Sequence, residues 1–261
     1  MTFEIIRLMI VLSGLLLTVV LFYHFPRLAK LKDEKFPLQK ISIIIPARNE
    51  EKNIALLLGD LAKQKISIHE IICVDDASED KTSEVIKSFP VQLLVIKDKP
   101  QGWLGKSWAC ESGAAIATGD ILLFIDADVR LSPDSVFKLL TTHVNEKSAI
   151  SVQPYHKTEK FYEQFSLIFN FIQFAGNGSG LPQQRNVGFF GPVIMISRED
   201  YQAIDGHNSV KGTIIEDVAL GEQMKRHQIP YKNFIGDGDI SFRMYSGGFR
   251  SLFQGWTKNM G

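Results

Sequence analysis

Short apolar runs rich in β-branched residues alternate with longer stretches of helical periodicity from residue 41 onward, and this alternation restricts the fold more than any other feature. The apolar runs predict strands at residues 41–46, 70–75, 91–97 and 121–126. Helices are predicted at residues 49–64, between the second and third strands, at 105–118, and from Ser132, an N-cap followed by Pro133. Strands that alternate with helices form a parallel sheet covered by helices on both faces. The sequence therefore predicts an α/β fold.

Polar residues gather where the predicted strands end. The first strand ends in PARNEE, the second in DDAS and the fourth in DAD, and the glycine-bearing loop KPQGWLGKS follows the third. Any one of these clusters fits an ordinary turn, in which Asp, Asn, Ser and Gly are common. In an open parallel sheet, however, ligands bind beyond the carboxyl ends of the strands. Four polar clusters at that one edge therefore predict a ligand site.

Asp126 and Asp128 bracket a single alanine at the end of the fourth strand. Two carboxylates placed in this way repel each other, which raises the pKa of one of them unless a cation lies nearby. Both can reach one hard cation such as Mg²⁺ or Mn²⁺, which prefers oxygen ligands and is often shared with phosphates. A phosphate-bearing ligand is therefore expected. Since the sequence has neither G-x-x-x-x-G-K-S/T nor G-x-G-x-x-G after the first strand, the nucleotide must be held in another way.

The composition excludes some classes of protein. The 261 residues are 45% hydrophobic, which suits a packed core. Basic and acidic residues both number 29, so no net basic field attracts nucleic acid. Cys73 and Cys110 form no CxxC pair and are expected to be buried, reduced thiols of a cytosolic domain. The six histidines show no metal-ligand spacing, and His207 is expected to be a turn residue.

The N-terminal segment predicts a membrane helix. Between residues 5 and 25 only Arg7 and His24 can carry a charge, and a helix of that length spans roughly 30 Å, the thickness of a bilayer core. A cleaved signal peptide is the alternative, but no small-x-small cleavage site follows the apolar run. We therefore expect residues 1–25 to be a single-pass anchor in the cell membrane.

The linker at residues 26–40 predicts the orientation of this anchor. It carries five basic residues against two acidic ones, whereas the N-terminal flank of the apolar run has only Arg7. By the positive-inside rule, the domain at residues 41–261 is expected on the cytoplasmic face.

Five segments resemble, in their order and spacing, the motif series of family 2 glycosyltransferases with the GT-A fold. They are PARNEE, VDDAS at 74–78, GWLGKSWA at 102–109, IDADV, and IIEDVALGEQMKR at 214–226. The resemblance covers about residues 41–258 and implies a Rossmann-like domain with a mostly parallel central sheet. Within that family, three further segments are most similar to the bacterial glycosyltransferases of C30 carotenoid synthesis, at residues 151–170, 188–201 and 242–259.

The resemblance implies a role for each motif. The base and ribose of a UDP-sugar donor would be bound by Pro46, Ala47, Arg48, Glu50, Asp75 and Asp76. The donor diphosphate would lie near Lys106 and Asp126, with Asp126 and Asp128 holding Mg²⁺ or Mn²⁺. Glu216 and Asp217 would form the catalytic ED motif, with Asp217 as the base. Gln254 and Trp256 stand where processive relatives carry Q-x-x-R-W near the acceptor, and the missing arginine favours a single transfer.

The implied activity is that of an inverting, metal-dependent hexosyltransferase. It would move glucose from UDP-glucose onto a hydrophobic membrane acceptor, a C30 carotenoid carboxylate, and would have no nucleic-acid partner. Transfer to a polyprenyl phosphate or a glycerolipid would use the same motifs. A sugar-nucleotide pyrophosphorylase is disfavoured because that class carries G-x-G-x-R after its first strand, where this chain has PARNEE. A non-catalytic scaffold would not need both acidic pairs.

Three segments keep a structural interpretation beside the functional one. Glu216 and Asp217 open a predicted helix, where acidic residues also complement the helix dipole. Residues 240–261 interleave aromatic and basic side chains, as in an interfacial helix or in a segment packed on the core. The third segment fits a helix packed on the sheet or an apolar acceptor groove, with Phe161, Phe165, Phe169 and Ile172 at helical spacing. Relatives continue into further membrane helices, so a complete chain and a fragment both fit the sequence.

Overall fold

The computed structural model describes residues 2–30, 39–183, 185–244, 248 and 253 of the chain. Its centre is a seven-stranded sheet in the order β3-β2-β1-β4-β8-β6-β9. The strands are β1 Ile41–Ala47, β2 Glu70–Asp76, β3 Gln92–Ile96, β4 Ile121–Ile125, β6 Ala149–Gln153, β8 Val193–Ser197 and β9 Tyr231–Ile235. All neighbours pair in parallel except β8, which is antiparallel to both β4 and β6. The predicted mostly parallel sheet is confirmed.

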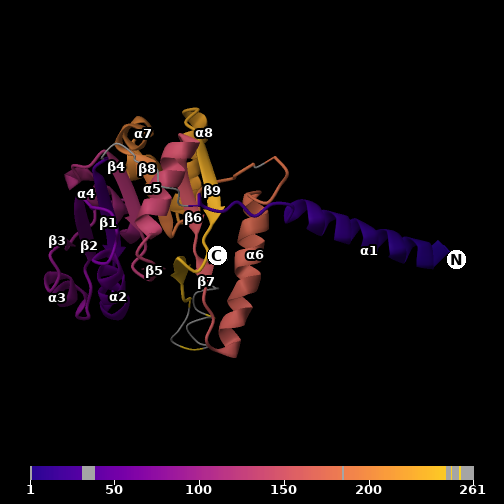
Figure 1. The fold of residues 1–261 in the computed structure, drawn as a ribbon, viewed down its shortest axis with the longest axis horizontal. Coiled ribbons are helices and arrows are strands. Elements are labelled where there is room, and N and C mark those ends of the chain that lie inside the picture. Colours follow the sequence, from indigo (N-terminus) through magenta and orange to yellow (C-terminus); the bar gives the residue numbers. More distant parts are fainter. Residues whose placement is uncertain (1, 31–38, 184, 245–247, 249–252, 254–261) are drawn as a thin grey trace.

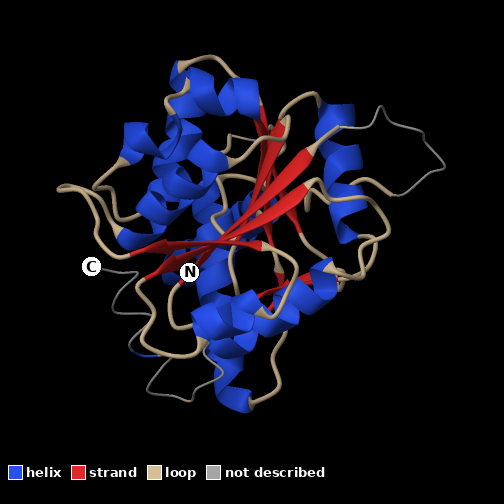
Figure 2. Cartoon of the chain, turned by 90° about the vertical axis from the view of Figure 1, so that its left-hand side faces the viewer, coloured by secondary structure: helices blue, strands red, loops and turns tan. Residues whose placement is uncertain are grey.

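Helices cover both faces of this sheet, as Figure 2 shows. Side chains alternate along β1, so that Ile43 and Ile45 enter the core on one face and Ile44 enters the core on the other. The first face is covered by α2 Glu51–Leu61, α3 Thr82–Lys87 and α5 Ser135–Glu146. The second face is covered by α4 Gly105–Ile116, α7 Arg198–Ala203, the 3₁₀ helix η2 Gly206–Val210 and α8 Glu216–Arg226. Burial on both faces explains why the strands are continuous apolar runs.

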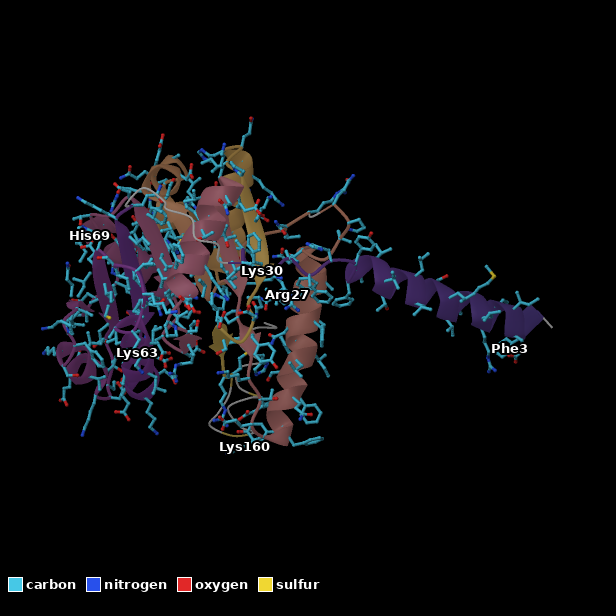
Figure 3. The ribbon with its side chains drawn as sticks, viewed as in Figure 1. Phe3, Arg27, Lys30, Lys63, His69 and Lys160 are labelled. Carbon is cyan, nitrogen blue, oxygen red and sulfur yellow. The ribbon has the colours of Figure 1, made fainter. Side chains whose placement is uncertain are left out.

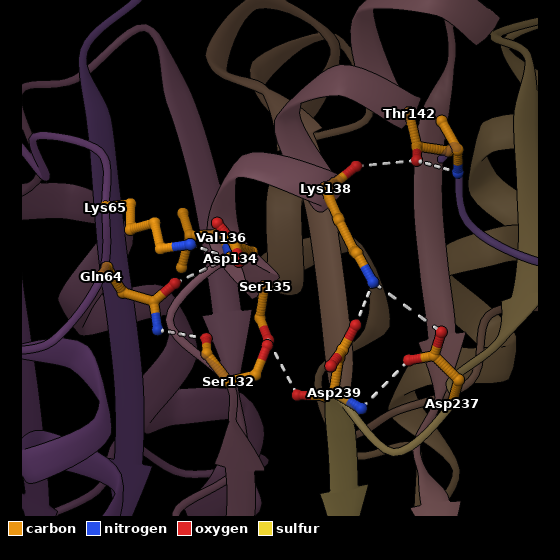
Figure 4. A network of polar contacts seen from close by, with 11 residues as sticks. Gln64, Lys65, Ser132, Asp134, Ser135, Val136, Lys138, Thr142, Asp237 and Asp239 are labelled. Atoms are coloured by element: carbon orange, nitrogen blue, oxygen red, sulfur yellow. Dashed lines mark hydrogen bonds and ion pairs between the residues drawn. The ribbon is translucent and has the colours of Figure 1, made fainter. Parts of the chain in front are cut away.

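A second, three-stranded sheet has the order β5-β10-β7. Its strands are β5 Val129–Leu131, β7 Tyr155–His156 and β10 Ile240–Phe242. Polar contacts join it to the main domain: Ser132 N donates to Asp239 O at 2.8 Å, and Lys138 contacts the carboxylates of Asp237 and Asp239 (Figure 4). This sheet is short, but it fixes the chain that directly follows Asp128.

The helix predicted from Ser132 begins three residues later, at Ser135. Ser132 completes a turn instead, because its carbonyl accepts from Ser135 N at 3.1 Å and also from the Gln64 amide at 2.7 Å. Gln64 Oε1 in turn accepts from Val136 N at 3.0 Å (Figure 4). The expected N-cap role of Ser132 is therefore wrong, since Gln64, which follows α2, and Asp239, which precedes β10, hold that residue outside the helix.

Two helices lie apart from the layered core. Helix α1 Thr2–Leu21 projects from the domain, and its apolar side chains are exposed along its length (Figures 1 and 3). It is long and apolar enough to cross a membrane, by its length and composition. Helix α6 Phe165–Asn177, preceded by the 3₁₀ helix η1 Phe161–Gln164, lies on the side of the domain from which α1 leaves (Figure 1). Both termini of α6 are held by the domain, as described below.

Candidate active site

The carboxylates at the end of β2 have different environments. Asp75 is buried and accepts one hydrogen bond on each oxygen, from Ser78 N at 2.9 Å and from the Ser83 hydroxyl. Asp76 instead faces Arg48, whose Nη1 lies 3.5 Å from Asp76 Oδ2. A Cβ added to Gly105 would overlap Asp76 Oδ2, so the first residue of α4 packs directly on this carboxylate. Asp76 is therefore buried at this edge beneath an ion pair with Arg48, whose side chain is exposed.

Residues at the end of β1 lead into the same region. Pro46 and Ala47 are the last two residues of the strand, and Pro46 lines the small pocket described below. Glu50 is fixed by Thr82, whose hydroxyl oxygen accepts from Glu50 N at 2.8 Å. The Glu50 carboxylate accepts from Asn53 at 2.7 Å. Burial raises the pKa of Glu50 in spite of that hydrogen bond, and Asp126 raises it further.

Lys106, in the first turn of α4, is the centre of the site. Its Nζ lies 2.8 Å from Asp126 Oδ1 and 3.6 Å from Glu216 Oε1. Burial alone would lower the pKa of Lys106, but Asp126 and Glu216 outweigh that effect and raise it. One cation therefore holds together two carboxylates that the sequence places 90 residues apart.

The first turn of α8 supplies Glu216 and one further carboxylate, Asp217. Burial raises the pKa of both Glu216 and Asp217, and Lys106 partly offsets this effect in each. Asp217 Oδ1 accepts from Val218 N at 3.0 Å, and a Cβ at Gly191 would overlap its Oδ2. The Asp217 carboxylate therefore packs directly on the backbone of Gly191, which has no side chain. A small pocket joins these groups, lined by Pro46, Lys106, Cys110, Phe124, Asp126, Gly191, Ile194, His207, Glu216 and Asp217.

Asp128 lies two residues beyond Asp126, and its carboxyl group is strained electrostatically. Burial raises its pKa to about 7, and the charges of Asp126 and Glu50 add to the increase. A divalent cation fits this donor set, since it would relieve the repulsion among oxygen ligands of the kind that Mg²⁺ and Mn²⁺ prefer. Within the described residues, no three His, Cys, Asp or Glu side chains are grouped so as to hold a metal alone.

The structure adds His207, which the sequence presented as a turn residue. The turn is real, because Asp205 and Gly206 both have positive φ. The imidazole, however, is buried and lines the pocket beside Lys106 and Asp217. Its Nδ1 lies 2.8 Å from the Tyr201 hydroxyl, which itself donates to Glu111 at 2.9 Å. Burial lowers the pKa of His207 to about 3, so the ring is neutral.

The segment at residues 188–192 lies within the stretch 188–201 that carries the resemblance, but no role in the site was predicted for it. Its backbone is fixed by buried polar side chains: Phe190 N donates to Ser151 Oγ at 2.6 Å, and the Gly188 carbonyl accepts from Asn177 at 2.9 Å and from Asn233 at 2.7 Å. The Pro192 carbonyl accepts from Asp126 N at 2.9 Å. This segment therefore positions Asp126 and Asp217 relative to each other. The sequence does not predict this positioning role, because the partners are scattered along the chain: Asp126 follows β4, Ser151 lies in β6, Asn177 in α6 and Asn233 in β9.

Two predictions concern residues expected near the acceptor: the pair Gln254 and Trp256, and the apolar stripe at residues 161–172. Gln254 and Trp256 lie outside the described residues, and most of the interval 240–261 does too. In α6 the stripe expected to pack on the sheet is largely exposed: Phe161 is 77%, Phe165 40% and Ile172 64% accessible. The packed-helix interpretation is therefore wrong for these three side chains.

The comparisons with known proteins agree with this geometry. The sequence model of the family described as Glycosyl transferase family 2 matches residues 42–205. A 4,4'-diaponeurosporenoate glycosyltransferase of Staphylococcus aureus (strain USA300) is 40% identical over 238 residues, which are 88% of this chain and 63% of that protein. The chain thus spans about three fifths of the length of the curated relatives it matches.

Two solved structures share the fold. The mannosyltransferase PcManGT from Pyrobaculum calidifontis, in complex with GDP-Man and Mn²⁺, has a TM-score of 0.58 at 17% identity and covers 82% of this chain and 59% of its own. Staphylococcus aureus TarS 1-349 in complex with UDP-GlcNAc has a TM-score of 0.58 at 16% identity and covers 81% of this chain and 60% of its own. The expected GT-A fold is confirmed. Together with the family match, which covers more than half of the sequence, it shows that the chain belongs to glycosyl transferase family 2.

Proposed function

We propose that this protein is a membrane-anchored hexosyltransferase that moves glucose from UDP-glucose onto a hydrophobic acceptor at the cytoplasmic face of the membrane. The observation that carries this proposal is the convergence of Lys106, Asp126, Glu216 and Asp217 on one pocket at the carboxyl edge of the parallel sheet. These residues come from three separate parts of the chain, and a scaffold would not need three partly buried carboxylates around one ammonium group.

The donor would bind along the ends of β1 and β2. Asp76 and Arg48 present a carboxylate and a guanidinium at this edge, and Asp75 is held rigidly beneath them by Ser78 and Ser83. A carboxylate can accept hydrogen bonds from a uracil N–H and from ribose hydroxyls. TarS was solved with UDP-GlcNAc, which supports a uridine nucleotide here.

Asp126 and Asp128 would hold a divalent cation on the diphosphate, with Lys106 beside it. When bound, the cation would stabilise the negative charge that develops on the departing nucleotide. The raised pKa of Asp128 supports a site whose carboxylates would be stabilised by a divalent cation, and the Mn²⁺ of PcManGT supports the class of metal.

Transfer would be a single displacement with inversion. An acceptor oxygen forms a bond to the anomeric carbon while the bond from that carbon to the phosphate oxygen breaks, and the electron pair leaves with UDP. For an alcohol acceptor, Asp217 takes the hydroxyl proton. A carboxylate acceptor is already ionised near pH 7, because such groups titrate near ~4. Burial of Asp217 raises its pKa, which suits a proton acceptor.

A hydrophobic acceptor is supported by the surroundings of Glu216. Ile214 and Ile215 directly precede it and are 66% and 54% exposed, an unusual choice beside a charged pocket. The curated relatives are named for a carotenoid carboxylate, 4,4'-diaponeurosporenoate. A polyprenyl phosphate or a glycerolipid would contact the same two exposed isoleucines.

The test supplies the purified full chain in detergent with Mn²⁺ or Mg²⁺, a panel of UDP-sugars, and carotenoid acid, polyprenyl phosphate or diacylglycerol. We expect mass spectrometry of the lipid extract to find a hexosyl ester of the carotenoid acid with UDP-glucose. The Asp126→Asn variant should lose this product. Asp120→Asn, at the other end of the same strand, is the matched control and should retain it. If no lipid gains a hexose under any pairing, the proposal fails.

A further inference from the structure

Helix α6 directs most of its polar side chains towards the domain and exposes a row of large apolar side chains. The side that faces the domain carries Ser166 and Asn177, which are buried together with Phe174, and the half-buried Asn170. Asn170 is hydrogen-bonded to His156 at 3.0 Å and Asn177 to the Gly188 carbonyl at 2.9 Å. The opposite side carries an apolar stripe, defined as Phe161, Phe165, Ile168, Phe171 and Ile172, with accessibilities from 40% to 77%. Surface helices of soluble domains show the reverse pattern.

The apolar stripe lies on the side from which α1 leaves the domain. Phe171, a member of the stripe, meets Phe22 edge-on at a centroid distance of 5.8 Å. Phe22 and Phe25 also stack on Phe174 at 5.9 and 5.3 Å. The end of α1 is therefore packed on α6, and the stripe continues outward from that contact.

Backbone hydrogen bonds fix how the chain leaves α1 and enters the domain. His24 N donates to Gly180 O at 3.1 Å, Ile235 N donates to Pro26 O at 2.7 Å, and Ala29 N donates to Thr142 Oγ1 at 2.9 Å. These three contacts join the exit of α1 to the loop after α6, to β9 and to α5. These hydrogen bonds, rather than a flexible linker, therefore determine the orientation of α1 relative to the domain.

In that orientation α6 runs across the direction of α1 (Figure 1). A membrane-spanning helix is tilted by roughly 20° on average from the bilayer normal, so a helix that runs across it lies nearer to the membrane plane than to the normal. The contact with Phe22 places α6 at the depth where α1 ends. The stripe would then face the bilayer along its whole length.

Charged residues stand at both ends of α6. Figure 3 places Lys160 at the end of α6 away from α1, and Arg27 and Lys30 near the end beside α1. All three side chains are exposed. Basic residues that flank an apolar face are typical of segments at the surface of a membrane with anionic lipids.

We propose that α6 is an interfacial helix that lies flat in the headgroup layer of the membrane spanned by α1, with the apolar stripe in the acyl region. The domain is then held at two points, so the face that carries the stripe is pressed against the bilayer. This inference rests on the proposed function only through the membrane anchor, and it does not depend on catalysis.

The experiment measures the depth of nitroxide labels in the full chain, reconstituted at one copy per nanodisc of phosphatidylcholine and phosphatidylglycerol. Labels are placed at Ile168→Cys and Ile172→Cys in the stripe. Gln173→Cys, an exposed neighbour off the stripe, is the matched control on the same helix, and Lys63→Cys reports a water-facing surface (Figure 3). The native Cys73 and Cys110 are buried and should stay unlabelled.

We expect the two stripe labels to favour oxygen over a water-soluble nickel chelate and to lie on the order of 5–10 Å below the headgroups, whereas the labels at 173 and 63 favour the chelate. Chelate access at 168 and 172 equal to that at 63 would overturn the proposal. Protection of both labels from both reagents would also overturn it, in favour of a second copy or another protein segment on this face. A label at Leu16→Cys in α1 tests the anchor separately, so a failure there is distinguishable from a failure of α6.

Discussion

Lys106 determines how the buried carboxylates of the site coexist. It contacts Asp126 and Glu216 at 2.8 and 3.6 Å, and its charge lowers the pKa of Asp217 against the effect of burial. A diphosphate bound at this edge would compete with those carboxylates for the same ammonium group. Glu216 and Asp217 would then lose part of the charge compensation that they now receive, which favours proton uptake by one of them.

Asp217→Asn should separate the two kinds of acceptor. Transfer to an alcohol needs a base, whose contribution is typically 10²- to 10⁴-fold, so the variant should lose that activity. Formation of an ester from a carotenoid carboxylate needs no proton removal, so the rate of this reaction should fall only slightly in the variant. The measurement compares initial rates of the variant and the wild type with both acceptors. Glu222→Gln, an exposed position on the same helix, is the control. Equal losses with both acceptor types would contradict the assignment.

At the scale of the elements, β1 and β4 were predictable because both are buried on both faces and so read as apolar runs, and the edge strand β3 was predictable from its β-branched and leucine residues. The antiparallel β8 was not predicted, because its place between β4 and β6 depends on a long excursion through α6. The same holds for the site. Residues directly after β1, β2 and β4 could be found from their position, whereas His207 reaches the pocket only through the packing of η2 on α4 and α8.

Alanine substitutions at Gly188 and Gly191 test how the loop at residues 188–192 positions Asp217. A Cβ at Gly191 would overlap only the carboxylate of Asp217, which can swing aside. Gly191→Ala should therefore lower transfer to alcohol acceptors while the free energy of unfolding changes little. A Cβ at Gly188 would overlap the backbone of Val218, so Gly188→Ala should cost about 1–3 kcal/mol.

Urea unfolding and initial-rate assays on both variants check this distinction. Gly59→Ala, which has open space around the added Cβ, is the control for a glycine substitution without contacts. A large loss of stability in Gly191→Ala would show that the loop cannot accommodate the methyl group, and would remove the proposed link to Asp217.

Glu163 ties the start of α6 to the chain that follows β10. It is fully buried and accepts from Arg243 Nη2 at 2.6 Å, and this bond lowers its pKa to about 2. Because an unfolded Glu titrates near ~4.3, the ion pair should contribute roughly 2–3 kcal/mol at neutral pH. That contribution is present above pH ~5 and is lost as the pH falls towards ~2.

Glu163→Gln should therefore be less stable than the wild type at pH 7, and the difference should shrink at pH 3. Urea unfolding at the two pH values measures it. Glu159 contacts the same arginine at 2.7 Å but is 69% exposed, so Glu159→Gln is the matched control and should cost no more than about 1 kcal/mol. A difference for Glu163→Gln that is independent of pH would refute the role of its charge.

At the scale of the whole molecule, the residues that line the pocket and those that hold the exit of α1 belong to different parts of the chain. The pocket is built from β1, α4, β4, η2 and α8, together with residues around β8. The exit of α1 is instead bonded to β9, to α5 and to the loop after α6. The side chains of α1 itself are exposed, so this helix adds nothing to the core of the domain. Donor binding and access to a membrane acceptor should therefore be separable.

Removal of residues 2–21 tests this separation. The affinity for UDP, measured by calorimetry, should be unchanged, because the donor edge makes its described contacts within the domain. Transfer to an acceptor embedded in vesicles should fall by on the order of 10²-fold or more, since the anchor raises the effective concentration of the domain at the bilayer. The apolar stripe of α6 should still retain part of the shortened protein on anionic vesicles. A parallel loss of UDP affinity and transfer would mean that α1 supports the fold of the site, and the division of labour argued here would be wrong.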